Sequence, residues 1–443
     1  MDILEKAAQM LAEYPLCDHC LGRQFALLGY GVENENRGEA IKLLLTMKGH
    51  QLTLAKEDAG VALLKSVATN GSFDMARGIL KRFKKRAKSK KPCFLCEGKF
   101  EALDALAEKV VAKLEGYEFA TFLIGVELPL EMAEREDEFK AHFNITHSES
   151  MKSQFSRDIG KRTSKITRRE VEFKTPDVVV LITPFTGGAR LQVNPLFVAG
   201  RYRKLVRGIP QSRWLCGECR GKGCESCSWT GKRYQNSVEE LIGTPTLRMA
   251  EGKEFALHGA GREDIDARML GSGRPFVLEI KEPKKRFLDC RRLEQTINKS
   301  AGGKVEVQGL RFADKNVVRR FKRAETAEKT YRAIMEFDRD VSDEELKRIQ
   351  TALSSVVISQ QTPRRVLHRR ADLIREKYIY KAKVKRLSPK RAEIKIRCQG
   401  GLYIKELVTG DEERTKPSVA GILGIKATPL RLDVLSVAAG DEE

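Results

Sequence analysis

Paired cysteines constrain the fold of this chain more than any other feature of its sequence. Eight of the ten cysteines form four pairs with C-x-x-C spacing. A two-residue gap lets both thiolates converge on one tetrahedral ion from a tight turn, and in a reducing compartment such pairs are metal ligands far more often than disulfides. The pairs are Cys17/Cys20, Cys93/Cys96, Cys216/Cys219 and Cys224/Cys227.

The spacing of these pairs predicts two kinds of metal site. The two N-terminal pairs bracket a helical segment, and we expect one structural Zn²⁺ to join them. Two unrelated knuckles, or a single redox pair, are the alternatives. The other two pairs are only four residues apart within 214–234, which predicts a compact four-cysteine zinc knuckle. Because four thiolates leave no open coordination position, we expect this knuckle to be structural or RNA-facing rather than catalytic.

The charge of the chain indicates its partner. Lysine and arginine outnumber the acids by 82 to 61, for a net charge of +21, in a chain that is 41% hydrophobic. The excess gathers in short runs, which favours a polyphosphate partner over a solvated face or an acidic membrane. No apolar run approaches the ~18 residues of a membrane span, and no signal peptide is visible, so we expect a cytoplasmic protein. The basic runs lie at 81–91, 160–169, 201–208 and 319–325.

Hydrophobic periodicity divides the chain into four parts and predicts an α+β protein. A helical zinc-binding module covers 1–100, and a mixed α/β region follows at 101–212. The cysteine knuckle occupies 213–234, and a domain built on a mixed, largely antiparallel sheet covers 235–443. Ser342 and Glu345 form a capping box that starts one helix of this last domain. Strands are expected at 121–129, 177–184, 189–195, 274–283, 304–313, 392–400 and 429–437, and helices at 40–48, 73–83, 102–116 and 150–166.

The stretch GAGREDIDAR, residues 259–268, has two incompatible interpretations. A dinucleotide-binding turn needs a third glycine where Asp264 stands, and a carboxylate there would repel a pyrophosphate. The second interpretation is a catalytic carboxylate, kept ionised by Arg262 and Arg268. The alternative to a catalytic carboxylate is a salt-bridged turn with a purely structural role. Since neither a phosphate-binding loop nor a Ser–His pair is present, a lone carboxylate in a basic protein indicates chemistry on a base or sugar.

Several motifs resemble one enzyme family. GREDIDAR resembles the catalytic-aspartate motif of pseudouridine synthases, and CQGGLYIKELV (398–408) is similar to a later motif in which a strand ends in Tyr-Ile-Lys. SQQTPRRVLHRR (359–370) and GDEERTKPSVAGILG are similar to signatures of the archaeal/eukaryotic tRNA pseudouridine synthase that acts on T-loop uridines 54 and 55. The resemblance covers nearly the whole chain. It implies a pseudouridine synthase domain preceded by a zinc-stapled helical part and a THUMP-like RNA-binding part, and the knuckle looks like the archaeal form.

The resemblance also implies roles for individual residues. Asp264 would be the catalytic carboxylate, and Lys405 would pair with it. Tyr331 would stack on the flipped uridine. The alternative is that Tyr331 is a half-buried tyrosine on a helix with no role in substrate binding. Asp266 is expected only to support Arg268.

Four further residues are expected to contact the substrate. Ile404 and Leu432 would form an apolar wall, a role compatible with ordinary strand core. Tyr403 alternates away from Ile404, so it would pack beneath the site or lend a second aromatic contact. Arg262 completes the expected substrate-binding set.

The expected partner is the T-arm of tRNA, bound by a monomer that needs Zn²⁺ for structure and no cofactor for catalysis. Two other functions remain possible at this level. A non-catalytic, zinc-stabilised RNA-binding or processing factor would share the charge and the zinc modules, but it would not need Asp264, Tyr331 and Lys405 in one domain. A THUMP-linked base-thiolation enzyme would need a phosphate-binding loop for ATP, and none is visible.

Overall fold

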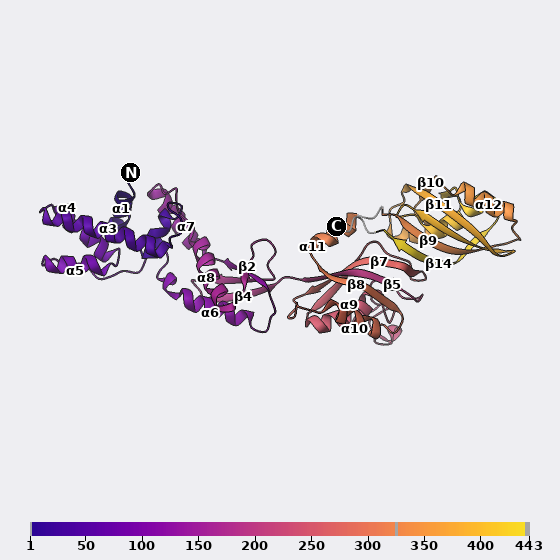
Figure 1. Cartoon of the computed structure of the whole chain (residues 1–443), viewed down its shortest axis with the longest axis horizontal. Helices are drawn as coiled ribbons and strands as arrows, with labels where there is room; N and C mark the ends of the chain where they lie inside the picture. Colours follow the sequence, from indigo (N-terminus) through magenta and orange to yellow (C-terminus); the bar gives the residue numbers. More distant parts are fainter. Residues whose placement is uncertain (1, 324–326, 439–443) are drawn as a thin grey trace. The chain divides into compact units, whose positions relative to one another are not determined.

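The computed structural model describes residues 2–323 and 327–438, which divide into two compact units, Met1–Asn194 and Pro195–Glu443 (Figure 1). Within this described part, no helix is long and apolar enough to cross a membrane. The basic run expected at 319–325 ends outside it, because residues 324 and 325 are not described.

The first unit combines a helical part with a small sheet. Its strands lie in the order β2-β1-β3-β4, with β1 parallel to β2 and β3, and β4 antiparallel to β3. The helices are α1 (Ile3–Glu13), α2 (Asp18–Gly22), α3 (Asn34–Leu54), α4 (Asp58–Thr69), α5 (Asp74–Arg82), α6 (Leu103–Leu114), α7 (Leu130–His142) and α8 (Met151–Thr167). The strands are β1 (Thr121–Val126), β2 (Glu170–Val171), β3 (Val178–Thr183) and β4 (Gly188–Val193).

One hydrophobic core runs through the whole of this unit. It contains Leu11 of α1 as well as Phe155 of α8 and Val180 of β3. The rings of Phe100 and Phe155 stack with their centroids 4.0 Å apart, which joins the end of the helical part to the sheet-covering helix. The helical module and the α/β region, expected as separate parts, therefore share one interior.

The second unit is built on a ten-stranded sheet with the order β13-β10-β11-β12-β9-β14-β7-β5-β8, and β6 pairs with β7. All neighbours are antiparallel except β14 and β7. The strands are β5 (Leu196–Lys204), β6 (Glu254–Gly259), β7 (Arg268–Lys281), β8 (Val305–Ala313), β9 (Lys329–Phe337), β10 (Val356–Gln361), β11 (Ile374–Ser388), β12 (Arg391–Cys398), β13 (Thr415–Lys416) and β14 (Ala427–Val437). The helices are α9 (Val238–Ala250), α10 (Cys290–Ser300), α11 (Lys315–Arg323), α12 (Asp343–Ala352), α13 (Ile404–Thr409) and α14 (Val419–Leu423).

Two cores lie on this sheet, one for each half. Phe276, Leu278 and Ile280 of β7 fall in the core that α9 and α10 cover, as their alternation predicts (Figure 1). The other core lies under α12, α13 and α14. The halves meet where β14 runs parallel to β7, with Asp433 opposite Arg268. This seam is the place where side chains from both halves can meet.

The α+β fold class expected from the sequence is confirmed, and the placement of β5 differs from expectation. We expected the first α/β region to reach residue 212, but β5 pairs with β7 and β8 inside the second unit. The expected boundary after residue 212 thus falls within the second unit. Short-range patterns cannot reveal this, because a strand's partners are chosen by long-range pairing.

Candidate active site and cysteine clusters

Asp264 lies in the loop between β6 and β7, directly before the seam. Gly261 gives this loop its turn, with a φ of 79° that side-chain-bearing residues rarely adopt. The Asp264 side chain is 34% exposed, so the carboxylate can reach a ligand. Its Oδ2 lies 3.3 Å from Arg365 Nη2 and 3.3 Å from Lys405 Nζ. Both cations come from the half of the sheet that does not carry the loop.

Lys405 is shared between two carboxylates. Its Nζ donates to both oxygens of Asp266, at 2.8 and 2.7 Å, and is farther from Asp264. Burial alone would raise the pKa of Asp266, but the hydrogen bond and charge of Lys405 lower it below its usual value. The expectation that Asp266 supports Arg268 is wrong. Arg268 instead pairs with Asp433 across the seam, at 3.0 and 3.1 Å.

The cations beside Asp264 differ in part from those expected. Lys405 is one of them, but Arg262 and Arg268 form no ion pair with Asp264 among residues 2–323 and 327–438. Arg262 is exposed. Arg365 takes their place, held by a 2.6 Å contact from its Nε to the buried Glu406. Arg365 lies in the stretch 359–370, which resembles a signature of the family, but the sequence predicted no role for Arg365 itself.

A buried polar network supports the loop from below. Glu263 is fully buried and accepts from the Tyr202 hydroxyl at 3.0 and 3.1 Å and from Arg274 Nε at 2.8 Å. Lys204 Nζ donates to the backbone oxygens of Asp264 and Ile265, at 3.0 and 3.2 Å. Burial lowers the pKa of Lys204, while the charge of Glu263 opposes that shift. These contacts fix the backbone that carries the Asp264 carboxylate.

Sequence reasoning missed this network. The run 201–208 was interpreted as a basic RNA-facing surface, yet Tyr202 and Lys204 are fully buried. The available signal was strand alternation, since Tyr202 and Lys204 fall on the same face of β5 and so share one environment. Net charge by itself does not distinguish a buried lysine from an exposed one.

The two aromatic residues of the expected site approach it from different elements. Tyr331 lies on strand β9, not on a helix, and packs against both cores of the second unit. Burial raises the pKa of Tyr331, and the charge of Asp264 contributes in the same direction. Tyr403 lies directly before α13, and the Arg365 guanidinium lies over its ring, 5.8 Å from the centroid. The Tyr403 hydroxyl accepts from Arg370 Nη1 at 3.0 Å.

The apolar residues expected to line the site belong to the core beneath it. Ile404 and Leu432 are 3% and 9% exposed and share a core with Ala267, at the end of the loop that carries Asp264. Ile404 begins helix α13, so the expectation that a strand ends at Tyr-Ile-Lys is wrong; β12 ends earlier, at Cys398. At the start of the helix, the Tyr403 backbone N–H donates to Gln360 Oε1 at 2.8 Å, which satisfies a backbone donor that has no partner within the helix.

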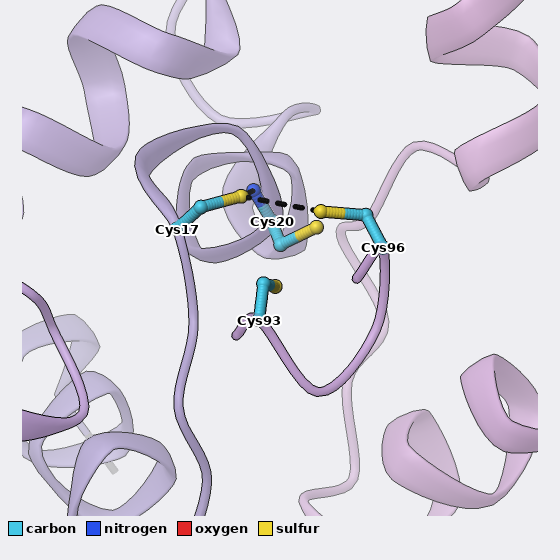
Figure 2. A group of neighbouring side chains, drawn as sticks. All are labelled: Cys17, Cys20, Cys93 and Cys96. Carbon is cyan, nitrogen blue, oxygen red and sulfur yellow. Dashed lines mark hydrogen bonds between the residues drawn. The ribbon is translucent and has the colours of Figure 1, made fainter. Parts of the chain in front are cut away.

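The N-terminal cysteines converge on one point (Figure 2). The four sulfurs of Cys17, Cys20, Cys93 and Cys96 lie within 4.8 Å of one another, and Cys17 Sγ is 3.6 Å from Cys96 Sγ. In a tetrahedral site with Zn–S distances of about 2.3 Å, the sulfurs lie about 3.8 Å apart, so these thiols fit such an ion. All four are free cysteines, and the separation is too long for a disulfide.

The second cluster has the same geometry on a smaller scaffold. Sulfur separations of 3.8 Å join Cys216 to Cys224 and Cys219 to Cys227, and Cys224 and Cys227 lie 3.7 Å apart. The backbone N–H of Gly231 donates to Cys227 Sγ at 3.2 Å, a contact that orients this sulfur. Both sets can therefore hold a tetrahedral metal ion, and neither leaves a coordination position for substrate.

Asp433 forms ion pairs at the seam, and the stability that these ion pairs contribute depends on pH. It accepts from Arg268, from Arg332 Nη2 at 2.8 Å and from Arg207 Nη2 at 2.5 Å. Burial would raise its pKa, but the hydrogen bonds from Arg268 and Arg332 outweigh it and lower the pKa to about 2. Because the pKa is depressed in the folded state, the stabilisation is complete above the unfolded pKa of about 3.9 and is lost as pH falls through about 2.

We expect Asp433→Asn to lower the free energy of unfolding by about 2 kcal/mol at neutral pH, the equivalent of the pKa shift. The difference from the wild type should shrink to about half of that value by pH 3, because the unfolded carboxyl is then protonated. Urea unfolding of the wild type and of Asp433→Asn between pH 7 and pH 3 measures this difference in the free energy of unfolding. A difference that stays constant over this range would contradict the assigned origin.

Comparison with known proteins identifies the family. The family described as "Pus10, C-terminal" matches residues 197–438, and "Pus10 THUMP domain, archaeal" matches residues 106–183. A protein named tRNA pseudouridine synthase Pus10 from Methanothrix thermoacetophila is 41% identical over 98% of this chain and 94% of its own length. The protein of the same name from Methanocaldococcus jannaschii is 44% identical over 97% of this chain and 93% of its own.

A solved structure is similar at a lower level. The crystal structure of a Cbf5-Nop10-Gar1 complex aligns with 46% of this chain and 46% of its own chain, at 14% identity and a TM-score of 0.29, too low to bear on function. The two relatives that match nearly the whole chain establish its family, and the family resemblance inferred from GREDIDAR and LYIKE is confirmed. This chain belongs to the tRNA pseudouridine synthase Pus10 family.

Proposed function

We propose that this pseudouridine synthase converts uridine 54, uridine 55 or both in the T-loop of tRNA, with Asp264 as the catalytic carboxylate. The observation that carries the proposal is the Asp264 carboxylate beside the seam, 3.3 Å from both Lys405 and Arg365, with Tyr331 of β9 opposite Val434 of β14 in the same sheet. A protein that only binds RNA has no need to hold an accessible carboxylate between two cations.

The reaction breaks the bond between C1′ of the ribose and N1 of uracil and forms a bond from C1′ to C5. The proton on C5 is lost and N1 gains one, so the change is an isomerisation with no redox step. Asp264 acts at the sugar–base junction, either by adding to a carbon or by taking the C2′ proton. Lys405 and Arg365 orient the carboxylate, because each places a cationic nitrogen 3.3 Å from Asp264 Oδ2.

The target uridine must leave the stacked loop to reach Asp264, which costs a few kcal/mol. Tyr331 lies opposite Val434 of β14, which pairs with Met269 just after the Asp264 loop, and stacking of the uracil on the Tyr331 ring would return ~1–3 kcal/mol. Tyr403 and Arg262 lend further contacts to the nucleotide. Ile404 and Leu432 support the pocket floor from the core, which limits escape of the freed uracil.

The exposed basic side chains between Lys81 and Lys91 are proposed to hold the tRNA backbone. Three of them, Lys81, Lys85 and Arg86, border an open cavity of about 420 Å³ at α5 together with Arg77 and Asp74. Contacts of this kind add affinity without reading sequence. The protein is proposed to act as a monomer in the cytoplasm.

The test of this proposal is to incubate the protein with an unmodified tRNA transcript and to map pseudouridine by carbodiimide treatment and primer extension. A stop in the T-loop that depends on the protein is the expected result. Binding of the transcript without any such stop would favour the non-catalytic RNA-binding factor instead.

Both cysteine clusters are proposed to bind structural Zn²⁺. We expect two zinc ions per chain by elemental analysis, with one lost in Cys20→Ser and the other lost in Cys227→Ser. Cys290, which belongs to neither cluster, provides the control, and Cys290→Ser should retain both ions. Because metal binding contributes to folding, chelation should also lower the thermal midpoint of the wild type. Two ions retained in either cluster variant would refute the assignment.

A further inference from the structure

The cysteine knuckle at 216–231 is built from two equivalent eight-residue halves. CGECRGKG begins at Cys216 and CESCSWTG begins at Cys224. In each half the second cysteine accepts a backbone hydrogen bond from the final glycine, Gly223 N to Cys219 Sγ and Gly231 N to Cys227 Sγ, both at 3.2 Å. The halves therefore repeat in geometry as well as in sequence, and their positions can be compared one by one.

The halves differ in a position where the backbone favours glycine. The first half has Gly221 there, with a φ of 99°, and the second has Trp229, with a φ of 62°. A bulky side chain at positive φ costs free energy that glycine would avoid. The preceding residue, Ser228, also has a positive φ of 51°. Folding of the knuckle alone would be better served by glycine at position 229, so the indole serves another purpose.

The indole of Trp229 faces water. It is 76% exposed, and no ring or guanidinium stacks on it within the described residues 2–323 and 327–438. The other tryptophan of the chain, Trp214, is already engaged, with Arg233 5.7 Å and Tyr234 5.7 Å from its ring. In this segment, therefore, the Trp214 indole packs against neighbouring side chains, whereas the Trp229 indole is exposed to solvent.

The backbone beneath Trp229 is fixed. Its N–H donates to Cys224 O at 2.8 Å, and its carbonyl packs so closely on Gly223 that a Cβ there would lie 2.9 Å from the oxygen. The knuckle itself is anchored to α9, where the backbone N–H of Arg213 donates to Glu239 at 2.9 Å and Lys232 forms an ion pair with Glu240. A ring on a rigid, anchored loop loses little entropy when it is bound.

The charge around the ring indicates what it binds. Residues 213–234 contain five basic and two acidic side chains, and Arg220, Lys222 and Arg233 are exposed. A fixed, exposed aromatic face on a basic knuckle matches an unpaired nucleobase, which stacks on the ring while neighbouring phosphates meet the exposed cations of the knuckle. An acidic or apolar protein surface would not use both features. We propose that Trp229 is a base-stacking residue that binds an unpaired nucleotide of the RNA substrate outside the catalytic pocket.

This inference rests on the proposed function, because its ligand is the tRNA substrate. Trp214→Phe and Trp229→Phe each leave a single tryptophan. Unmodified tRNA transcript should quench the emission of Trp214→Phe, which retains Trp229, and should leave that of Trp229→Phe largely unchanged. A fully paired RNA duplex should quench neither. Absence of quenching in Trp214→Phe while tRNA still binds would overturn the inference.

Trp229→Gly separates binding from folding. Glycine relieves the positive φ, so this variant should be no less stable than the wild type and should keep its zinc. Its Kd for tRNA should rise about 5- to 150-fold, the range equivalent to the ~1–3 kcal/mol of one base stack. Leu215→Ala, which removes an exposed apolar side chain from the same knuckle, should leave the Kd unchanged.

The two proposals fail in different ways. If the wild type forms pseudouridine and Trp229→Gly binds and modifies tRNA with wild-type Kd and KM, the stacking inference is wrong and the enzyme assignment stands. If the wild type forms no pseudouridine, the proposed function fails, and quenching of Trp214→Phe by tRNA still decides whether Trp229 stacks on RNA.

Discussion

Replacing Asp264 with asparagine is expected to reduce pseudouridine formation by about 10⁴-fold or more, the scale on which removal of a catalytic group acts. Asparagine keeps the shape of the side chain but can neither add to a carbon nor accept a proton as a carboxylate does. The loop should stay in place, because it is held by Glu263 and Lys204 and not by the Asp264 side chain. Single-turnover assays on tRNA transcript, with binding measured in parallel, give both quantities.

Asp266→Asn is the matched control. Asp266 lies two residues away, is more exposed and shares Lys405. Its removal leaves Lys405 free to pair fully with Asp264, so we expect a much smaller loss of turnover. Wild-type turnover in Asp264→Asn would show that the assignment of the catalyst is wrong. Equal losses of turnover in the two variants would mean that the charge of the loop matters and not one carboxylate.

Replacing Glu263 with alanine is expected to destabilise the second unit by about 3–5 kcal/mol, because it leaves a buried arginine without its partner. Arg274 is 1% exposed and donates to Glu263 at 2.8 Å, and the Tyr202 hydroxyl would lose its acceptor as well. Burial raises the pKa of Tyr202 well above its usual value, so this hydroxyl stays protonated and needs an acceptor. Urea unfolding followed by circular dichroism measures the change.

A second ion pair in the same sheet provides the comparison. Glu254 and Lys281 lie 3.0 Å apart but are both exposed to solvent, so Glu254→Ala should leave the urea midpoint almost unchanged. Glu263→Gln, which retains one acceptor oxygen, should fall between the two. If Glu263→Ala unfolds at the same urea concentration as Glu254→Ala, the buried network does not support the loop as we infer.

Much of the fold was predictable because it depends on short-range patterns. The helix from Asp343 begins at the capping box of Ser342, and β12 and β14 follow the alternation of their apolar residues. The C-x-x-C spacing likewise places the two thiolates of each pair on one side of a turn, whereas the meeting of the pair 17/20 with the pair 93/96 depends on long-range packing. The short-range features need only neighbours in the chain, so the sequence alone is enough to identify them.

The arrangement around Asp264 was only partly predictable. Asp264 and Lys405 were identified through motif resemblance, but Arg365 and the buried Glu263, Tyr202 and Lys204 were not. Asp264 and Arg365 are about a hundred residues apart in the chain, and the parallel pairing of β14 with β7 brings their elements together. Nothing local to either residue encodes that pairing.

By itself, the sequence determined the chemistry available to this protein: carboxylates in a glycine-containing loop, two sets of four thiols and a strong excess of basic residues. These are properties of residue type and spacing. Only the tertiary structure decided which cations meet the carboxylate, which lysine is buried and which tryptophan is presented to solvent. The physical reason is that charge pairing and burial depend on distances in space, which long-range strand pairing sets.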